Sequence, residues 1–484
     1  MQSKRKQAMM QSRFERVRGI HFIGIGGSGM CGIAEILHRL EFTVTGSDAN
    51  ESANTLRLKN MGIKVHMGHA PEHVAGADAV VVSSAINESN VEVIEARARH
   101  LPLVPRAVML GELMRYRAGI AIAGTHGKTT TTSMLATIFA QAGLDPTYVI
   151  GGQLRSIGSN AYLGKGSHLI TEADESDASF IHLQPDISVV TNIEQDHMNH
   201  YGNDPEKLHA IFLQFLHNLP FYGLAVLCAD DAVVQKLIPQ LARPKVTYGF
   251  SESADYRLSD YRQEGVSCAF SLHCPGGDRL EIDLCTPGRH NALNAAACIT
   301  IARDIDIPDQ AICKALAGFS GVSRRFEVLG NYHAPGKKKL APPVTLIDDY
   351  GHHPTELGCT IQAARDAWPN RRLVVLFQPH RFSRTRELFD EFVQTLIKPD
   401  VLILMETYPA GEKSIPGFES KHLATNVRAL GKSEVFLASN LEKLQSMLHD
   451  VLKPDDLLLT QGAGTVGQVA AALAASSLAR VEKA

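Results

Sequence analysis

The chain has 484 residues, 44% of them hydrophobic and 20% charged, and its formal net charge at pH 7 is −3. This length and composition are typical of a soluble globular protein with about three domains. The near-neutral charge argues against nucleic acid or a membrane surface as a partner, and no apolar run is long enough for membrane insertion. The eight cysteines form no Cys-x-x-Cys pair, which indicates reduced thiols in a cytoplasmic protein rather than a disulfide framework or a zinc site.

The first third of the chain predicts a strand, a glycine turn and a helix. An apolar strand at 19–23 runs into the turn at 24–29, a helical pattern follows, and the next strand, 43–46, leads to Asp48. A G-x-G-x-x-G turn with an acidic residue after the second strand fits the dinucleotide fingerprint. More generally, it indicates the diphosphate of a nucleotide at a helix N-terminus. The candidate residues for this site are Gly26, Gly27, Ser28, Gly29 and Asp48.

A further predicted strand, 78–82, stops at Ser83 and Ser84. Polar residues at the carboxyl end of such a strand lie at the crevice where open α/β sheets bind ligands. Both serines are therefore candidates for the same site. The alternative is that they cap a helix, which is a common role of serine.

Residues 119–143 predict a strand, a phosphate loop and a helix in succession. A glycine loop before a helix lets backbone N–H groups face an anion, Lys128 can reach outer phosphates, and the Thr129 hydroxyl can bind magnesium. Only two residues separate the loop's glycines, where the usual fingerprint has four, and the alternative is an ordinary turn with a surface lysine. The candidate phosphate-binding residues are Gly124, Thr125, His126, Gly127, Lys128, Thr129 and Thr130.

Two more predicted strands of the middle third end in turns that carry carboxylates or a histidine. The strand at 168–171 leads into 172–177, where four carboxylates within six residues would repel one another unless cations or N–H donors lie among them. Magnesium is one reason for such a cluster, with Glu172 its first candidate ligand, and a solvated acidic loop is the alternative. The strand at 187–191 leads to His197, which alone would more often be structural but shares the same sheet edge.

The rest of the middle third predicts a small antiparallel annex and then a helix. Strand-like segments at 224–228, 245–248 and 266–272 alternate with turn residues. Asn291 and Asn294 then lie on one face of a helix start, where their amides can pair with the edge of a base. Capping of the helix by Asn291 explains the spacing equally well.

The last third returns to alternating strands and helices, which predicts a second, mostly parallel sheet. Its turns carry Asp349 and His352 after one strand, and Arg381 and Arg384 after the next. Arginines three residues apart form a clamp for a carboxylate or phosphate. Solvent-exposed arginines are the disfavoured alternative, because the positive end of a helix dipole repels cations unless anions lie nearby. The late G-x-G-x-x-G at 462–467 reads as a tight strand–helix turn.

Eight stretches in order resemble the Mur ligase family over nearly the whole chain. They are GIGGSGMCGIAE (24–35), AGTHGKTTTT (123–132), EADESDASF (172–180), TNIEQDH (191–197), PGRHNALNA (287–295), SRRF (323–326), DDYGHHPTE (348–356) and FQPHRFSRTR (377–386). The resemblance implies an α/β fold of three domains and an ATP-dependent ligase of peptidoglycan precursors. It implies a Rossmann-like domain for a UDP-sugar at 1–118, a central P-loop ATPase-type domain at 119–325, and a C-terminal Rossmann-like domain at 326–484 that closes with the amino acid.

The resemblance also assigns roles position by position. Lys128 corresponds to the phosphate lysine, Thr129 and Glu172 to ligands of the magnesium ion that bridges the outer phosphates, and His197 to a ligand of a second magnesium. The other matches are Asn291 and Asn294 on the adenine side, Arg325 and Asp349 as a nucleotide-side pair, and His352, Arg381 and Arg384 near the amino acid and the reacting carboxylate. The complete ligand set of the second magnesium stays open.

One departure from sibling ligases indicates a branch of the family. Several siblings carry a carbamylated lysine in the helix after the Asp-His turn, whereas the helix expected at 207–216 has a lysine only at its start. This is expected of the alanine-adding branch, so the resemblance implies UDP-N-acetylmuramate and L-alanine as substrates, ATP and Mg²⁺ as cofactors, and a monomer or weak homodimer.

Three alternatives remain from the residues. A nicotinamide-dependent dehydrogenase would use 24–29 and Asp48 but would leave the loop at 124–130 and the carboxylates at 172–177 unexplained. A nucleotide switch would hydrolyse ATP without making an amide. Another member of the same family would add a different amino acid or a whole peptide.

Overall fold

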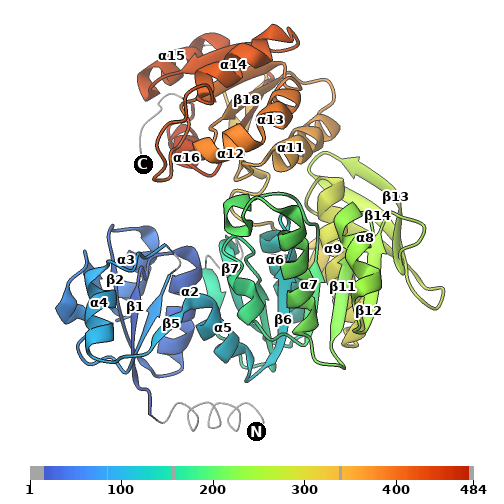
Figure 1. The fold of residues 1–484 in the computed structure, drawn as a ribbon. Helices are drawn as coiled ribbons and strands as arrows, with labels where there is room; N and C mark the ends of the chain where they lie inside the picture. Colours follow the sequence, from blue (N-terminus) through green and yellow to red (C-terminus); the bar gives the residue numbers. More distant parts are fainter. Residues whose placement is uncertain (1–15, 84, 155–158, 337–340, 479–484) are drawn as a thin grey trace. The chain divides into compact units, whose positions relative to one another are not determined.

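The computed structural model describes residues 16–83, 85–154, 159–336 and 341–478 (Figure 1). The chain folds into two compact units. The first unit runs to Asp260 and also includes Phe270–Ile282 and Leu293–Ser320; the second consists of Tyr261–Ala269, Asp283–Ala292 and the chain from Gly321 onward. The predicted α/β fold is confirmed, with three separate sheets. Within the described ranges no helix is long and apolar enough to span a membrane.

The first sheet has the strand order β3-β2-β1-β4-β5, and all of its strands are parallel. Its strands are β1 (Gly19–Ile23), β2 (Thr43–Asp48), β3 (Lys64–Met67), β4 (Ala79–Val82) and β5 (Leu103–Pro105). Its helices are α2 (Ser28–Arg39), α3 (Ala53–Asn60), η1 (Pro71–Val74), α4 (Val91–Ala98) and α5 (Arg106–Met114). The central strand β1 is buried along its whole length, as expected of a parallel strand covered on both faces. The chain reverses its strand order between β1 and β4, which places a ligand crevice beyond their carboxyl ends.

The second sheet has ten strands in the order β15-β14-β13-β12-β11-β10-β6-β9-β7-β8. They are β6 (Ala118–Ala123), β7 (Thr147–Leu154), β8 (Ser159–Tyr162), β9 (His168–Glu172), β10 (Ile187–Val190), β11 (Leu224–Cys228), β12 (Lys245–Gly249), β13 (Tyr256–Glu264), β14 (Ser267–His273) and β15 (Arg279–Leu284). The helices of this part of the chain are α6 (Lys128–Gln141), η2 (Ser179–His182), η3 (Met198–Tyr201), α7 (Pro205–His217), α8 (Ala232–Leu237), η4 (Ile238–Gln240), α9 (Arg289–Asp304) and α10 (Asp309–Ala317).

The prediction of a small antiparallel annex is wrong for the segments 224–228 and 245–248, and all three of its segments belong to the central sheet. Strand β11 pairs in parallel with β10 and with β12, and β12 pairs in parallel with the start of β13. These strands extend the central sheet instead of forming a separate one. The physical reason is that the free edge of the sheet offers a row of backbone donors and acceptors, and further strands satisfy it by continuing the ladder.

Helix α2 joins the first two sheets into one unit. It packs against β7 and β8, and its Gly32 allows a close approach, because a Cβ there would lie 3.0 Å from the Cβ of Ala161. Phe22 of β1 and Val149 of β7 accordingly belong to the same buried apolar cluster. The domain boundaries that we expect at 118/119 and 325/326 stay predictions.

The third sheet lies in the second unit and has the order β16-β17-β21-β18-β19-β20. Its strands are β16 (Glu327–Tyr332), β17 (Val344–Asp349), β18 (Leu373–Phe377), β19 (Val401–Met405), β20 (Glu434–Ala438) and β21 (Leu457–Gln461). Its helices are α11 (Pro354–Ala367), α12 (Phe382–Glu387), α13 (Phe389–Leu396), α14 (Ser420–Ala429), α15 (Leu441–Val451) and α16 (Val466–Ala475). Only the edge strand β16 is antiparallel to its neighbour among the described strands of this sheet. Neighbouring residues of β17, Leu346 and Ile347, enter two different apolar clusters, so helices cover both faces of this sheet.

Candidate functional site

Three neighbouring strands of the second sheet deliver the turns that the sequence singled out. Strand β6 lies between β10 and β9 and is parallel to both. Because the carboxyl ends of parallel strands meet at one edge of a sheet, the phosphate loop after β6 lies beside the acidic loop after β9 and the turn after β10. This is the arrangement expected of a nucleotide site.

Two glycines fix the path of the phosphate loop. Gly124 has a φ of +130°, and a Cβ there would lie 2.1 Å from the hydroxyl oxygen of Thr191. Gly127 has a φ of +86°, and a Cβ there would lie 2.6 Å from Oδ1 of Asn294. Both positions exclude larger residues on two grounds, backbone conformation and space. The predicted base-side residue Asn294 therefore lies against the phosphate loop.

Residues after β10 hold the loop from one side. The His126 N–H donates to Oδ1 of Asn192 at 2.8 Å, and the Thr191 hydroxyl donates to the His126 carbonyl at 2.6 Å. The Glu194 N–H donates to the Thr125 hydroxyl at 2.8 Å. Sequence reasoning did not assign Thr191 or Asn192 to the site. The signal that could have found them is their position directly after a strand adjacent to β6.

The ammonium of Lys128 lies inside the loop. It donates to the carbonyls of Gly124 at 2.5 Å and Thr125 at 3.0 Å and pairs with Oε2 of Glu175 at 2.6 Å. The side chain is only 15% exposed, so the surface-lysine alternative is wrong. Burial alone would lower the pKa of Lys128, but Glu175 and the other nearby carboxylates outweigh burial and raise it. The lysine is a fixed cation at the start of α6.

Each carboxylate of the acidic loop has a hydrogen-bond donor or a cation beside it. Glu172 accepts the N–H of Gly151 at 2.6 Å, Asp174 accepts that of Ser176 at 3.1 Å, and Asp177 accepts that of Ser179 at 3.0 Å. Glu175, one of the four carboxylates that the sequence places in this loop, is 5% exposed and pairs with Lys128. Burial raises the pKa of Glu175 to about 7, against the opposing effect of the ammonium.

The predicted magnesium ligands come from three different elements. Thr129 is buried in the first turn of α6, and Glu172 ends β9. His197 has a φ of +55°, and its Nε2 lies 3.5 Å from a carboxylate oxygen of Asp196. Hydroxyl and carboxylate oxygens suit magnesium, whereas imidazole is a less typical ligand for it. In the described part of the chain, Glu172 and His197 belong to no tight group of three metal-binding side chains, so this assignment stays a prediction.

The first glycine turn is built without a lysine. Gly27 caps α2, and the N–H of Gly26 donates to Oδ2 of Asp48 at 2.8 Å. Asp48, the predicted ribose ligand, thus also shapes the turn. Ser83 does not cap a helix, because α4 begins later and is capped by Asn90; its hydroxyl instead accepts the Ala85 N–H at 3.4 Å. Ser84 lies outside the described residues.

A cavity of about 220 Å³ lies between this turn and the acidic loop, within the first unit. It is lined by Gly27, Ser28, Gly29, Met30, Ser83, Arg106, Leu110, Val149, Ile150, Gly151, Thr171, Glu172 and Asp174. It therefore connects predicted residues of both sites, the sugar-nucleotide turn and the metal-binding loop.

A buried carboxylate that the sequence did not reveal supports the first sheet. Glu92 is fully buried and accepts the Ser47 hydroxyl at 2.5 Å, while His73 lies 2.6 Å and His69 3.3 Å from its oxygens. Burial alone would raise the pKa of Glu92, but the nearby His21 imidazole, 3.6 Å away, and the contacts with Ser47 and His73 lower it to about 2. These residues are far apart in the sequence, so no local pattern could have predicted the cluster.

In the second unit, the predicted nucleotide-side residues Arg325 and Asp349 each contact other groups of the chain. Asp349 accepts backbone N–H groups from Phe326 at 2.8 Å and Gly351 at 2.7 Å, whereas Arg325 lies over the Tyr350 ring and 3.6 Å from Glu356. The neighbouring residues Arg324 and Asp348 form an ion pair, at 2.8 Å. Asn291 lies inside α9 and its side-chain amide donates to the Pro287 carbonyl at 2.7 Å, so the capping alternative is wrong.

The two arginines of the predicted clamp lie at a short helix after β18, with Arg381 just before α12 and Arg384 within it, and the clamp itself stays a prediction. Arg384 is 5% exposed and lies 3.3 Å from Nδ1 of His380, whose ring is 5.7 Å from that of His352. Arg381 has a φ of +69° and caps α12. The anion that we expected at this helix start is the chain's own Glu412, which accepts the Ser383 N–H at 2.9 Å and its hydroxyl at 2.6 Å. Arg384 is therefore not a solvent-exposed arginine.

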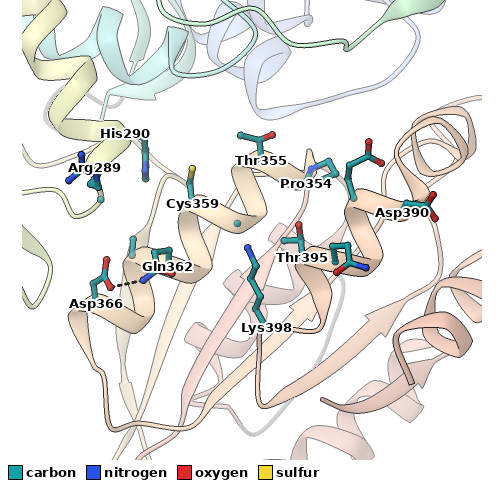
Figure 2. Close-up of a pocket in the computed structure, with 15 residues that line it drawn as sticks. Arg289, His290, Pro354, Thr355, Cys359, Gln362, Asp366, Asp390, Thr395 and Lys398 are labelled. Atoms are coloured by element: carbon teal, nitrogen blue, oxygen red, sulfur yellow. Dashed lines mark hydrogen bonds between the residues drawn. The ribbon is translucent and has the colours of Figure 1, made fainter. Parts of the chain in front are cut away.

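The second unit also contains a larger cavity, of about 810 Å³, along one face of α11 (Figure 2). Figure 2 shows Cys359, Gln362 and Asp366 of α11, with Lys398 pointing toward that helix. Gly358 leaves room there, because a Cβ would lie 3.7 Å from Nζ of Lys398. His290 also lines this cavity, and burial lowers its pKa. None of the predicted catalytic residues is among its described lining residues.

Known proteins similar to this chain cover nearly all of it. A UDP-N-acetylmuramate-alanine ligase from Thermotoga maritima superposes with a TM-score of 0.79 at 27% identity, over 95% of this chain and 98% of that one. A murein peptide ligase from Psychrobacter arcticus has a TM-score of 0.68 at 23% identity, over 96% and 99%, and supports the fold alone. A UDP-N-acetylmuramate:L-alanyl-gamma-D-glutamyl-meso-diaminopimelate ligase from Neisseria meningitides has a TM-score of 0.59 at 28% identity, over 64% and 100%.

Family models match along the chain in three consecutive segments. Residues 19–118 match the Mur ligase family catalytic domain, 122–302 the Mur ligase middle domain, and 324–464 the Mur ligase glutamate ligase domain. This assignment to a ligase family replaces the dehydrogenase and nucleotide-switch alternatives. The chain belongs to the Mur ligase family, whose members are ATP-dependent ligases of peptidoglycan precursors.

Proposed function

We propose that this protein is a UDP-N-acetylmuramate–L-alanine ligase, which uses ATP to join L-alanine to the lactyl carboxylate of UDP-N-acetylmuramate. The observation that carries the proposal is the pairing of two nucleotide-type glycine turns in one unit, with a cavity between the first turn and the acidic loop beside the second. Such a pairing suits a reaction between a sugar nucleotide and ATP. The proposal places peptidoglycan precursor synthesis in the cytoplasm.

Two observations support alanine as the amine. The chain is similar over 95% of its length to a protein named as an alanine ligase, at 27% identity. Helix α7, which follows the Asp-His turn, has its only lysine, Lys207, near its start. Several sibling ligases carry a carbamylated lysine in this helix. The alternative is a ligase that adds a peptide. The similarity to the Neisseria meningitides protein over 64% of the chain supports this alternative.

A carboxylate does not react with an amine at pH 7, so it must first be activated. In the proposed reaction an oxygen of the lactyl carboxylate attacks the γ-phosphorus of ATP, the bond to the leaving oxygen of ADP breaks, and an acyl phosphate forms. The neutral amine of alanine then attacks the acyl carbon, phosphate leaves with the bonding electrons, and the amine loses a proton. His352 and His197 are the candidate bases.

The chain's own residues supply position and charge. Lys128 and the N–H groups of the loop would hold the phosphates of ATP, with Asn291, Asn294, Arg325 and Asp349 on the nucleotide side. Magnesium, held by Thr129 and Glu172 with His197 at a second ion, would neutralise charge as two anions approach. Arg381 and Arg384 would position the amino acid. We assign the UDP-sugar to 1–118, ATP to 119–325 and closure with the amino acid to 326–484, in a monomer or weak homodimer.

The direct experiment measures ADP release by the full chain with UDP-N-acetylmuramate, Mg²⁺ and a panel of amines. The panel contains L-alanine, glycine, L-serine and the peptide L-alanyl-γ-D-glutamyl-meso-diaminopimelate. The proposal predicts that L-alanine gives the highest kcat/KM and that release needs both co-substrates. Stimulation by the peptide but not by alanine identifies the alternative instead.

A further inference from the structure

The cavity between the first glycine turn and the acidic loop has one basic side chain in its described lining, that of Arg106. Its other polar side chains are hydroxyls and the carboxylates of Glu172 and Asp174. Arg106 is the first residue of α5 and directly follows β5, so it lies at the carboxyl end of that strand. No motif in the sequence had singled it out.

The space for the Arg106 guanidinium comes from Gly29. A Cβ at Gly29 would lie 2.9 Å from Nη1 and 3.1 Å from Cδ of Arg106. Gly29 is in the first turn of α2, so its lack of a side chain lets the guanidinium lie at the helix start that we expect to hold a diphosphate. A cation at the positive end of a helix is unfavourable unless an anion lies between them.

The donors of Arg106 are largely unused. Its one ion pair among the described residues joins Nη2 to Oδ2 of Asp174 at 3.7 Å, which is too long for a hydrogen bond. The side chain is only 18% exposed, so water reaches it poorly. The guanidinium therefore has five N–H donors in a mostly buried position, and its contact with the described chain is this long ion pair. Such a group is suited to bind a planar anion with two oxygens.

The charges of the cavity wall indicate which anion this is. The diphosphate has the N–H groups of the α2 start available to it. A carboxylate that must reach the phosphate loop approaches Glu172 and Asp174, which repel it, and among the described lining residues Arg106 is the cation that offsets this repulsion. Accordingly, and resting on the proposed function, we propose that Arg106 binds the reacting lactyl carboxylate of the sugar nucleotide and positions it for attack on ATP.

A binding comparison tests this role without requiring turnover. Isothermal titration calorimetry is performed with UDP-N-acetylmuramate and with UDP-N-acetylglucosamine, which has the same diphosphate but lacks the lactyl carboxylate. We expect the wild type to bind the first more tightly. Arg106→Gln should lose about 100-fold of affinity for UDP-N-acetylmuramate, because the carboxylate then lacks its charged partner, and should leave UDP-N-acetylglucosamine unchanged.

The controls separate this role from folding and from the diphosphate. Arg106→Lys keeps the charge and should recover part of the discrimination, while Arg99→Gln removes an exposed arginine that pairs with Glu95 and should change neither affinity. The melting temperature of each variant reports folding. Equal losses for both sugar nucleotides would assign Arg106 to the diphosphate and overturn the proposal, as would no loss for either.

The same experiment distinguishes this proposal from the proposed function. If the wild type makes no alanyl product but discriminates between the two sugar nucleotides through Arg106, the alanine-ligase function fails and the role of Arg106 stands. If it makes the product while Arg106→Gln discriminates as well as the wild type, the function stands and the role of Arg106 fails. A wild type that binds both sugar nucleotides equally overturns the Arg106 proposal.

Discussion

The two glycine turns of the first unit both precede a helix, but the charged side chains that contact them differ. The turn before α2 has no lysine, and its Gly26 N–H is bound by the carboxylate of Asp48. The loop before α6 encloses the ammonium of Lys128, which the buried Glu175 neutralises. We therefore expect the first turn to bind an anion with backbone groups and the second to bind it with the lysine ammonium, which Glu175 holds in place. We expect the first to suit a diphosphate that is only held, and the second to suit a phosphoryl group that is transferred.

The largest expected effect comes from removing the charge of the second loop. Lys128→Met should lower kcat/KM at least about 1,000-fold, because the developing charge on the transferred phosphoryl group loses its cation. Binding of UDP-N-acetylmuramate to the first turn should be unchanged by calorimetry. Loss of both properties together would contradict separate sites.

The variant needs a control, because Lys128→Met alone leaves the buried carboxyl of Glu175 without its partner. The double variant Lys128→Met/Glu175→Gln removes both charges. Its melting temperature should return toward that of the wild type, whereas its turnover should stay as low as that of the single variant. Recovery of turnover would remove Lys128 from the reaction.

The next effect contrasts the glycines of the two turns. Gly124→Ala should abolish measurable ATP binding, because the new Cβ would lie 2.1 Å from the Thr191 hydroxyl at a φ of +130°. Gly26→Ala should weaken UDP-N-acetylmuramate only about 10-fold, since its Cβ would meet the ends of two side chains, Asp48 and Thr55, each at 2.8 Å. Each variant is the control for the other, and calorimetry with both ligands gives the comparison. A crossed result, with Gly26→Ala losing ATP, would exchange the two assignments.

The buried carboxylate of Glu92, which accepts a hydrogen bond from Ser47 beside the first turn, should make the stability of the fold depend on pH. The pKa of Glu92 falls from 4.5 to about 2, so its network stabilises the fold fully above pH 4.5 and this contribution disappears as the pH falls toward 2. The shift corresponds to about 3 kcal/mol. Glu92→Gln should therefore be less stable than the wild type by about this amount at pH 7, and the difference should shrink in acid. Urea unfolding at pH 7 and pH 3 measures both values, and a difference that does not depend on pH would contradict the charged network.

The smallest expected effect concerns Asp48, whose carboxylate accepts the Gly26 N–H in the first turn. Asp48→Asn keeps an oxygen that can accept the Gly26 N–H but removes the charge. We expect a change of about threefold or less in the affinity for UDP-N-acetylmuramate, whereas Asp48→Ala, which leaves the N–H without its acceptor, should cost about 10-fold. Calorimetry with both variants decides between them. Equal, large losses would show that the charge contacts the ligand directly.

The sequence was sufficient where a local pattern determines the chemistry. Strand, loop and helix follow one another at Gly124 and Lys128, so the buried lysine and the positive φ values could be anticipated. The order of strands could not be anticipated, which is why the segments that form β11, β12 and β14 were assigned to a separate annex. Likewise, nothing local indicates that Arg324 pairs with Asp348.

The residues and contacts that sequence reasoning missed share one property. Glu92, Arg106 and the pairing of Glu175 with Lys128 depend on partners that are distant along the chain, and the fold alone brings these partners together. Spacing rules report neighbours within one helix or turn. Contacts between elements depend on strand order and helix packing, which a single sequence does not specify.

The central claim is that ATP activates the lactyl carboxylate so that alanine can displace the phosphate. The most direct measurement is mass spectrometry of the full chain's products after incubation with UDP-N-acetylmuramate carrying ¹⁸O in its carboxylate, L-alanine, ATP and Mg²⁺. The account predicts UDP-N-acetylmuramoyl-L-alanine, ADP, and inorganic phosphate that has gained one ¹⁸O from the carboxylate. Unlabelled phosphate, or ADP without the alanyl amide, would contradict it.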